Sequence, residues 1–238
     1  MSNEARPNEA RPNQARPNQA RPRDAPEPRS PRRWESPAVR VIDVVLASAA
    51  LLLLAVPLLL VAAAIRIDSP GPALFRQQRV GRAGRRFTMC KFRTMRVGAG
   101  DAQLRDLIAR ELRGEDTTVD GSTKIDRDSR VTVVGSWLRR TSVDELPQLL
   151  NVLRGQMALV GPRPCLDWEA EMFPSEFAER FTVRPGITGL WQVSGRSTTA
   201  TPEMLELDVA YARSWGFWTD LRILARTVPT LLRGHGAR

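Results

Sequence analysis

The longest uninterrupted apolar stretch of the sequence covers residues 44–65, which contain no charged side chain. As an α-helix, this stretch would be about 33 Å long, enough to cross the ~30 Å hydrocarbon core of a bilayer. It does not fit a cleavable signal peptide, because it is too long and a polar segment of about 40 residues precedes it. The pattern therefore predicts a membrane segment, which we place at residues 38–67.

Two features predict that this segment enters and leaves the membrane on the same side. Pro57 lies near its middle, where a proline removes a backbone hydrogen bond and bends a helix. Arginines flank both ends, and the positive-inside rule holds basic flanks on the cytoplasmic side. We therefore expect a re-entrant membrane helix bent at Pro57. A kinked helix that spans the membrane once is the alternative.

The N-terminal part of the chain has a different pattern. Residues 3–22 consist of four Asn-Glu/Gln-Ala-Arg-Pro pentads. A proline at every fifth position prevents a continuous helix, and the repeats offer almost nothing apolar to bury. Residues 1–37 are therefore predicted to be a disordered tail. A transit peptide is the rival interpretation, but these prolines oppose the amphipathic helix that it requires.

Residues 68–238 show the mixed pattern of an α/β domain, mostly helical with a small sheet. Residues 73–77 and 87–93 are expected to be extended and joined by the Gly-punctuated turn at 81–86. The polar residues 114–130 are expected to form a loop. Apolar positions at helical spacing predict helices at residues 102–113, 144–154, 202–215 and 219–232.

Composition narrows the chemistry that this domain can perform. The chain has one histidine and two cysteines, which argues against histidine-based triads, a disulfide framework and zinc sites of the usual spacing. The net charge of +10 is local: residues 66–96 carry nine basic and one acidic side chain, whereas residues 97–238 are nearly neutral. Such a distribution argues against a protein that coats nucleic acid. Catalysis would then use Asp, Glu, Arg, Lys, Ser or Thr.

The acidic pair Asp144-Glu145 is the strongest candidate for chemistry, and it has two interpretations. Ser142 and Glu145 have the spacing of a capping box, so both acids could simply stabilise a helix N-terminus. Alternatively, that N-terminus attracts phosphate and keeps a carboxylate ionised, as a nucleophile must be. Adjacent carboxylates diverge by roughly 100° on a helix, which suits one nucleophile and one ligand of a hard cation better than a glycosidase pair.

Further short motifs occur in order along the chain. They are RVID at 40–43, KFRTM at 91–95, SVDELPQ at 142–148, NVLRG at 151–155, LVGPRP at 159–164, and RPGITG with QVSGR between 184 and 196. Together they resemble the bacterial sugar transferases, the short, monotopic polyprenyl-phosphate phosphoglycosyl transferases. The resemblance covers residues 39–232 without large gaps. Glu206 and Asp208 also match, although a solvated helix face is an equally good interpretation of those two acids.

The resemblance implies an enzyme that transfers a phosphosugar from a UDP-sugar to undecaprenyl phosphate and releases UMP, with Mg²⁺ as cofactor. It implies that Asp144 is the nucleophile, forming an aspartyl-phosphosugar intermediate, and that Glu145 binds the metal. Arg163, between Pro162 and Pro164, would lie in the nucleotide subsite. The residues implied to contact phosphates are Lys91, Arg93, Arg139 and Arg196.

This interpretation implies an enzyme of the inner cell membrane, with its catalytic domain on the cytoplasmic face, acting in the first membrane step of polysaccharide or glycoconjugate assembly. Membrane lipids are expected partners, and nucleic acid is not. A homo-oligomer or an association with downstream glycosyltransferases is compatible with this role. The alternatives are an inactive membrane-anchored scaffold and a lipid-binding protein whose basic segment lies beside a single span.

Overall fold

A computed structural model describes residues 37–96, 101–117, 130–195 and 199–232. The predicted tail, apart from residue 37, therefore lies outside the described residues, as does Arg196. The described chain is mostly helical, with two small sheets, which confirms the predicted balance of helix and strand. Its larger helices are α1 (Pro37–Leu53), α2 (Ala55–Asp68), α3 (Ala102–Leu112), α4 (Val133–Thr141), α8 (Thr201–Ser214) and α9 (Phe217–Leu232).

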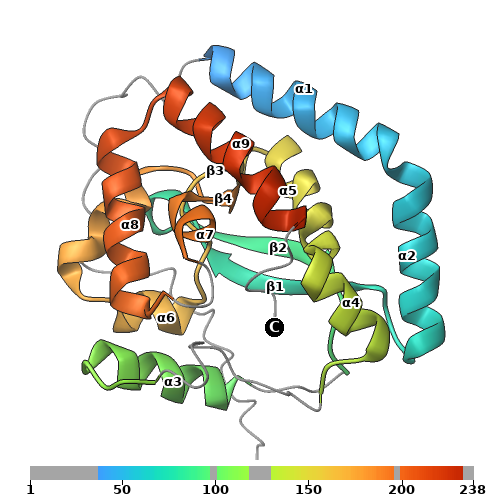
Figure 1. Ribbon diagram of the computed structural model, residues 1–238, viewed down its shortest axis with the longest axis horizontal. Helices are drawn as coiled ribbons and strands as arrows, with labels where there is room; N and C mark the ends of the chain where they lie inside the picture. Colours follow the sequence, from blue (N-terminus) through green and yellow to red (C-terminus); the bar gives the residue numbers. More distant parts are fainter. Residues whose placement is uncertain (1–36, 97–100, 118–129, 196–198, 233–238) are drawn as a thin grey trace, which may run out of the picture.

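Helices α1 and α2 form a bent arm along one side of the molecule (Figure 1). The chain bends by 64° between the two helices, at a break at Leu54. Pro57 is the third residue of α2, and a proline ring clashes with the carbonyl four residues earlier, here that of Leu53. The bend expected from Pro57 is therefore confirmed, although it lies three residues before the proline.

The arm carries large apolar side chains on its outer surface. Leu52, Leu53 and Ile67 are each at least 79% exposed, and Leu59 and Leu60 are also exposed. No single helix in the described chain is long and apolar enough to cross a bilayer, but α1 and α2 together meet the length and composition that a broken or re-entrant segment needs.

The larger sheet is the antiparallel hairpin of β1 (Leu74–Val80) and β2 (Arg86–Phe92). The chain turns between them through the short 3₁₀ helix η2 (Arg82–Gly84). This hairpin confirms the two predicted extended stretches and the turn between them. The helices predicted at 102–113, 202–215 and 219–232 also form, within two residues of the expected bounds.

The remaining elements are short, and only those within residues 143–153 fall on a predicted helix, the one expected at 144–154. The second sheet pairs β3 (Ala158–Val160) and β4 (Gly186–Thr188) in parallel. Their few residues sit in a Gly/Pro-rich stretch in which no alternation can develop. The other short elements are η3 (Val143–Gln148), α5 (Leu149–Leu153), α6 (Asp167–Met172), η4 (Ser175–Thr182) and α7 (Leu190–Ser194).

Two apolar clusters join the arm to the hairpin. Ala47 of α1 packs in one cluster with Phe87 and Met89 of β2 and with residues of α5. Ile65 of α2 packs in the other with Phe92 of β2 and Leu138 of α4. The arm is therefore part of the same core as the strand that carries Lys91, rather than a tether attached at one end.

Candidate active site

Asp144 and Glu145 lie in η3, between α4 and α5, and the predicted capping box does not form. Ser142 ends α4 in the left-handed conformation, with φ of 56°, and its side chain makes no capping hydrogen bond to η3. An N-cap needs an extended backbone for its side chain to reach the following amides. The continuous helix predicted over 144–154 is accordingly divided into η3 and α5.

Helix α4, which the sequence pattern did not predict, orients this turn. Its N-cap is Thr132, whose Oγ1 accepts a hydrogen bond from the Gly135 amide at 3.0 Å. A threonine three residues before a glycine, followed by Val133 and Val134, was the signal that could have located this helix. The Glu145 amide donates a hydrogen bond to the Ser142 carbonyl at 3.2 Å, but the Ser142 side chain does not cap η3, so both carboxyl groups remain available for other contacts.

Asp144 is a buried residue, with 9% of its surface exposed. None of the described residues donates a hydrogen bond to its carboxyl group. Burial and the neighbouring charge of Glu145 raise its pKa to about 6, against the opposing effect of Lys91, Arg139 and Arg163. At neutral pH the group is therefore mostly ionised and has no hydrogen-bond donor from the described chain, which is the condition of a carboxylate that can attack an electrophile.

Lys91, on strand β2, acts on this carboxylate through its charge. Burial and the neighbouring charges of Arg163 and Arg79 lower the pKa of its ammonium group to about 8. Its Nζ lies 5.4 Å from the centroid of the Phe75 ring. Lys91 is thus still charged at neutral pH, and it loses its charge within the pH range in which activity can be measured.

Arg163 approaches from the loop that follows β3. Its Nη1 lies 3.5 Å from Oε1 of Glu145, and 42% of its side chain is exposed. Pro162 and Pro164 flank Arg163 in the chain. Arg139 approaches the acid pair from α4, and its Nε donates a hydrogen bond to Oγ1 of Thr94 at 3.0 Å. The structure thus brings together most of the sequence-predicted site residues: Asp144, Glu145, Lys91, Arg139, Pro162, Arg163 and Pro164.

Arg93 does not join this group. Its guanidinium donates hydrogen bonds to the carbonyls of Ser69 at 2.7 Å and Pro70 at 2.6 Å, and reaches Ile65 O at 3.5 Å. It therefore fastens the C-terminal end of α2 to the end of the hairpin. The motif at 91–95 contains one cation beside Asp144 and one that supports the arm.

Three buried charged residues around the site were missed or misjudged in the sequence. Arg79 of β1 is 6% exposed, and its guanidinium charge helps to lower the pKa of Lys91. Asp208 of α8 is 1% exposed and bound to the buried Arg180, so its interpretation as part of a solvated helix face is wrong. The available signal for Asp208 was an acid between apolar neighbours, in LELDVAY.

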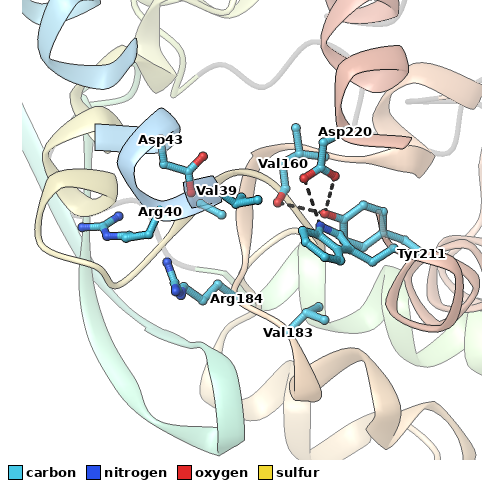
Figure 2. Close-up of a pocket in the computed structure, with 10 residues that line it drawn as sticks. Val39, Arg40, Asp43, Val160, Val183, Arg184, Tyr211 and Asp220 are labelled. Atoms are coloured by element: carbon cyan, nitrogen blue, oxygen red, sulfur yellow. Dashed lines mark hydrogen bonds between the residues drawn. The ribbon is translucent and has the colours of Figure 1, made fainter. Parts of the chain in front are cut away.

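A second group of polar residues surrounds a small cavity beneath the first turns of α1 (Figure 2). Tyr211 has its hydroxyl 2.8 Å from Oδ1 of Asp220. Arg40 donates hydrogen bonds to the carbonyls of Val152 at 2.7 Å and Leu153 at 2.9 Å, at the end of α5. Neither Asp144 nor Glu145 lines this cavity. Arg40 thus connects the arm to α5, the helix that directly follows η3.

The electrostatic balance of the Asp144 site favours a polyanion. Four cationic side chains, Lys91, Arg79, Arg139 and Arg163, gather around Asp144 and Glu145, and Arg79 also pairs with Glu169 at 3.5 Å. A cluster of cationic side chains in a partly buried site attracts phosphate groups, and arginine fits them with two parallel hydrogen bonds. Among the described residues, no group of three or more His, Cys, Asp or Glu side chains could enclose a metal ion.

The comparison with known families agrees with this chemistry. Residues 34–234 match the family model described as bacterial sugar transferase. The chain belongs to the bacterial sugar transferase family. The Asp144 site, the bent arm and the second sheet all lie within the matched residues, so the whole described structure is that of a bacterial sugar transferase.

Individual bacterial sugar transferases show how far the similarity extends. The chain is 45% identical to the UDP-glucose:undecaprenyl-phosphate glucose-1-phosphate transferase of Caulobacter vibrioides, covering 83% of this chain and 71% of that protein. It is 41% identical to the galactosyl transferase CpsE of Streptococcus agalactiae, covering 84% of this chain but only 43% of the relative. The exopolysaccharide production protein ExoY of Rhizobium meliloti is 38% identical, with 84% and 88% covered.

Proposed function

We propose that this sugar transferase moves a phosphosugar from a UDP-sugar to undecaprenyl phosphate, giving undecaprenyl-diphosphate-sugar and UMP. The observation that carries the proposal is Asp144: a buried carboxylate to which no described residue donates a hydrogen bond, facing Lys91, Arg139 and Arg163. The similarity to the Caulobacter relative, a UDP-glucose:undecaprenyl-phosphate glucose-1-phosphate transferase, supports the same reaction.

In the first step, a carboxylate oxygen of Asp144 attacks the phosphorus that carries the sugar. A bond forms between this oxygen and phosphorus, the P–O bond to the bridging oxygen of the diphosphate breaks, and UMP leaves with the electron pair. The product is an aspartyl-phosphosugar. Carboxylate nucleophiles form such acyl phosphates in other phosphoryl transfers.

In the second step, a phosphate oxygen of undecaprenyl phosphate attacks the same phosphorus. The bond to Asp144 breaks, which regenerates the carboxylate and completes the lipid diphosphate. Both steps bring anions together, so Lys91, Arg139 and Arg163 contribute mainly by offsetting this repulsion and fixing the reacting groups.

Glu145 is the residue that would hold Mg²⁺. Its carboxylate is adjacent to Asp144 in the chain, and 24% of its side chain is exposed. Mg²⁺ in such sites is held by one or two carboxylates together with substrate phosphates, so the lack of a larger acidic cluster among the described residues fits this metal. When bound, the ion neutralises charge on the donor diphosphate.

The outer surface of the arm supports attachment to a membrane. We infer that α1 and α2 form a re-entrant segment that holds the domain on the cytoplasmic face, beside the lipid acceptor. Leu52, Leu53 and Leu59 face outward on it, and basic residues flank both ends. A bent helix that returns to the same face leaves both flanks with the catalytic domain.

Labelling of single cysteines tests this topology. Ala38→Cys and Pro70→Cys each place a thiol at one exposed end of the arm, while the native Cys90 and Cys165 are buried. With a membrane-impermeant maleimide added to intact cells, neither variant should react, and both should react after lysis. Labelling of one variant in intact cells would contradict the re-entrant arrangement.

UMP release tests the reaction. Purified protein in detergent receives undecaprenyl phosphate, Mg²⁺ and each of several UDP-sugars. We expect release with at least one sugar, and a loss of roughly a thousandfold or more in Asp144→Asn, because the nucleophile is removed. The control Asp106→Asn changes an exposed acid of α3 and should retain wild-type activity. Release that survives Asp144→Asn would contradict the covalent mechanism, and no release with any sugar would favour a scaffold.

A further inference from the structure

The backbone around Arg163 is held by hydrogen bonds at successive carbonyls. Pro162 O accepts from the Gly186 amide at 2.9 Å, Arg163 O from Nη2 of Arg180 at 2.9 Å, and Pro164 O from Nη1 of Arg79 at 3.1 Å. Because Pro162 and Pro164 have no N–H groups, their carbonyls are the main points at which this loop can be fixed. Two of the three donors are buried arginine side chains rather than backbone groups.

Arg180 is itself held by Asp208. Its Nη2 lies 2.7 Å and its Nε 3.2 Å from Oδ2 of Asp208, with side-chain exposures of 2% and 1%. The guanidinium also lies 5.1 Å from the ring centroids of Phe173 and Phe181. One nitrogen, Nη2, therefore bonds to both the carboxylate and the Arg163 carbonyl.

Stability alone does not account for this pair. The desolvation of two buried charges offsets much of their attraction, and well-packed apolar residues of similar size are often equally stable. What an apolar pair would lack is a donor for the Arg163 carbonyl. The pair therefore fixes the backbone of Arg163, and the guanidinium of Arg163 reaches Glu145.

We propose that Arg180 and Asp208 are positioning residues for Arg163. By fixing the Arg163 carbonyl, they direct its guanidinium toward the diphosphate of the donor nucleotide. Both are too deeply buried to touch substrate, so they act only through Arg163. This inference rests on the proposed function, in which Arg163 meets the nucleotide.

The variants are chosen to separate positioning from folding. Arg180→Leu combined with Asp208→Leu removes both charges together and leaves no unpaired buried ion. Arg180→Lys keeps a cation opposite Asp208 but has a single nitrogen in place of the guanidinium fork. Each is also built in an Arg163→Ala background. Thermal unfolding identifies the variants that fold, and if the leucine pair does not fold, the lysine variant gives the same comparison.

Two measurements are made on each folded variant: the affinity for UMP by calorimetry, and kcat and KM in the UMP-release assay. We expect roughly tenfold weaker UMP binding and a similarly higher KM for the UDP-sugar, with the KM for undecaprenyl phosphate unchanged. In the Arg163→Ala background the same changes should have almost no further effect.

Equal losses with and without the Arg163 side chain would overturn the positioning role, and so would unchanged UMP affinity in both folded variants. Failure of the proposed reaction gives a different result. In that case the wild type releases no UMP from any UDP-sugar, while UMP binding still shows whether Arg180 and Asp208 act through Arg163. Wild-type protein that does not bind UMP would contradict both proposals.

Discussion

Asp144 and Asp208 are both buried aspartates with arginines nearby, but only one of the two carboxylates accepts hydrogen bonds from an arginine. Asp208 is bound at 2.7 Å and 3.2 Å by Arg180, so its charge is paired inside the core. Asp144 has cations around it, yet no described residue donates a hydrogen bond to it. A buried acid with a bound partner holds the structure together, whereas one without a donor is kept available for a ligand or a reaction.

The largest stability difference that we expect concerns these two acids. Asp208→Asn should lower the free energy of unfolding by about 3–5 kcal/mol, because it leaves Arg180 as an unpaired buried charge. Asp144→Asn should raise it at pH 7 by up to about 3 kcal/mol, since the folded chain raises the pKa of this acid from 3.8 to about 6. Urea unfolding of both variants beside the wild type measures this. Similar destabilisation by both substitutions would show that the two sites do not differ.

The comparison is sharpened by the pH dependence of kcat/KM. Below about pH 6 we expect the rate to fall roughly tenfold per pH unit, because Asp144 becomes protonated. Above about pH 8 it should fall again as Lys91 loses its proton. Lys91→Arg should move the alkaline fall upward and leave the acidic one in place. If the acidic fall lies near pH 4 in both the wild type and Lys91→Arg, it would contradict the raised pKa of Asp144.

A smaller effect is expected where the arm meets the catalytic domain. Arg40→Ala removes two hydrogen bonds from a charged donor to the end of α5, and should lower the free energy of unfolding by about 2 kcal/mol. Arg85→Ala, on the exposed turn of the hairpin, is the matched control and should have almost no effect. Equal results for the two variants would show that the Arg40 contacts do not hold the arm.

The smallest expected effect concerns Ser142, beside the acid pair. A capping serine loses about 1 kcal/mol of stability on substitution by alanine, whereas Ser142 makes no capping hydrogen bond to η3. Ser142→Ala should therefore change the free energy of unfolding by less than about 0.5 kcal/mol. Thr132→Ala, at the true N-cap of α4, is the positive control with the larger loss. A loss in Ser142→Ala equal to that in Thr132→Ala would restore the capping interpretation.

The sequence predicted the parts of this molecule that have a clear period or composition. The apolar segment, its bend near Pro57, the hairpin and the long helices α3, α8 and α9 follow from such patterns. Strands β3 and β4 have three residues each, too few for any periodicity. The left-handed Ser142 could not be predicted either, because serine in that conformation depends on the packing of α4 against its surroundings.

The candidate site shows the same division. The pattern itself indicated the acid pair Asp144 and Glu145, and the resemblance to the bacterial sugar transferases indicated Lys91 and Arg163. The sequence could not separate Lys91 from Arg93, two positions apart, since only the fold sends Arg93 to the end of α2. Nor could it pair Arg180 with Asp208, which lie 28 residues apart and meet only through tertiary packing.

The measurement that tests the central claim most directly is the detection of the intermediate on Asp144. Protein is mixed with Mg²⁺ and a UDP-sugar labelled in the phosphate next to the sugar, with no undecaprenyl phosphate added. We predict one equivalent of label bound to the chain, released by hydroxylamine, chased into lipid by undecaprenyl phosphate, and absent in Asp144→Asn. Transfer to undecaprenyl phosphate by wild-type protein that never carries the label, or label retained in Asp144→Asn, would contradict the account.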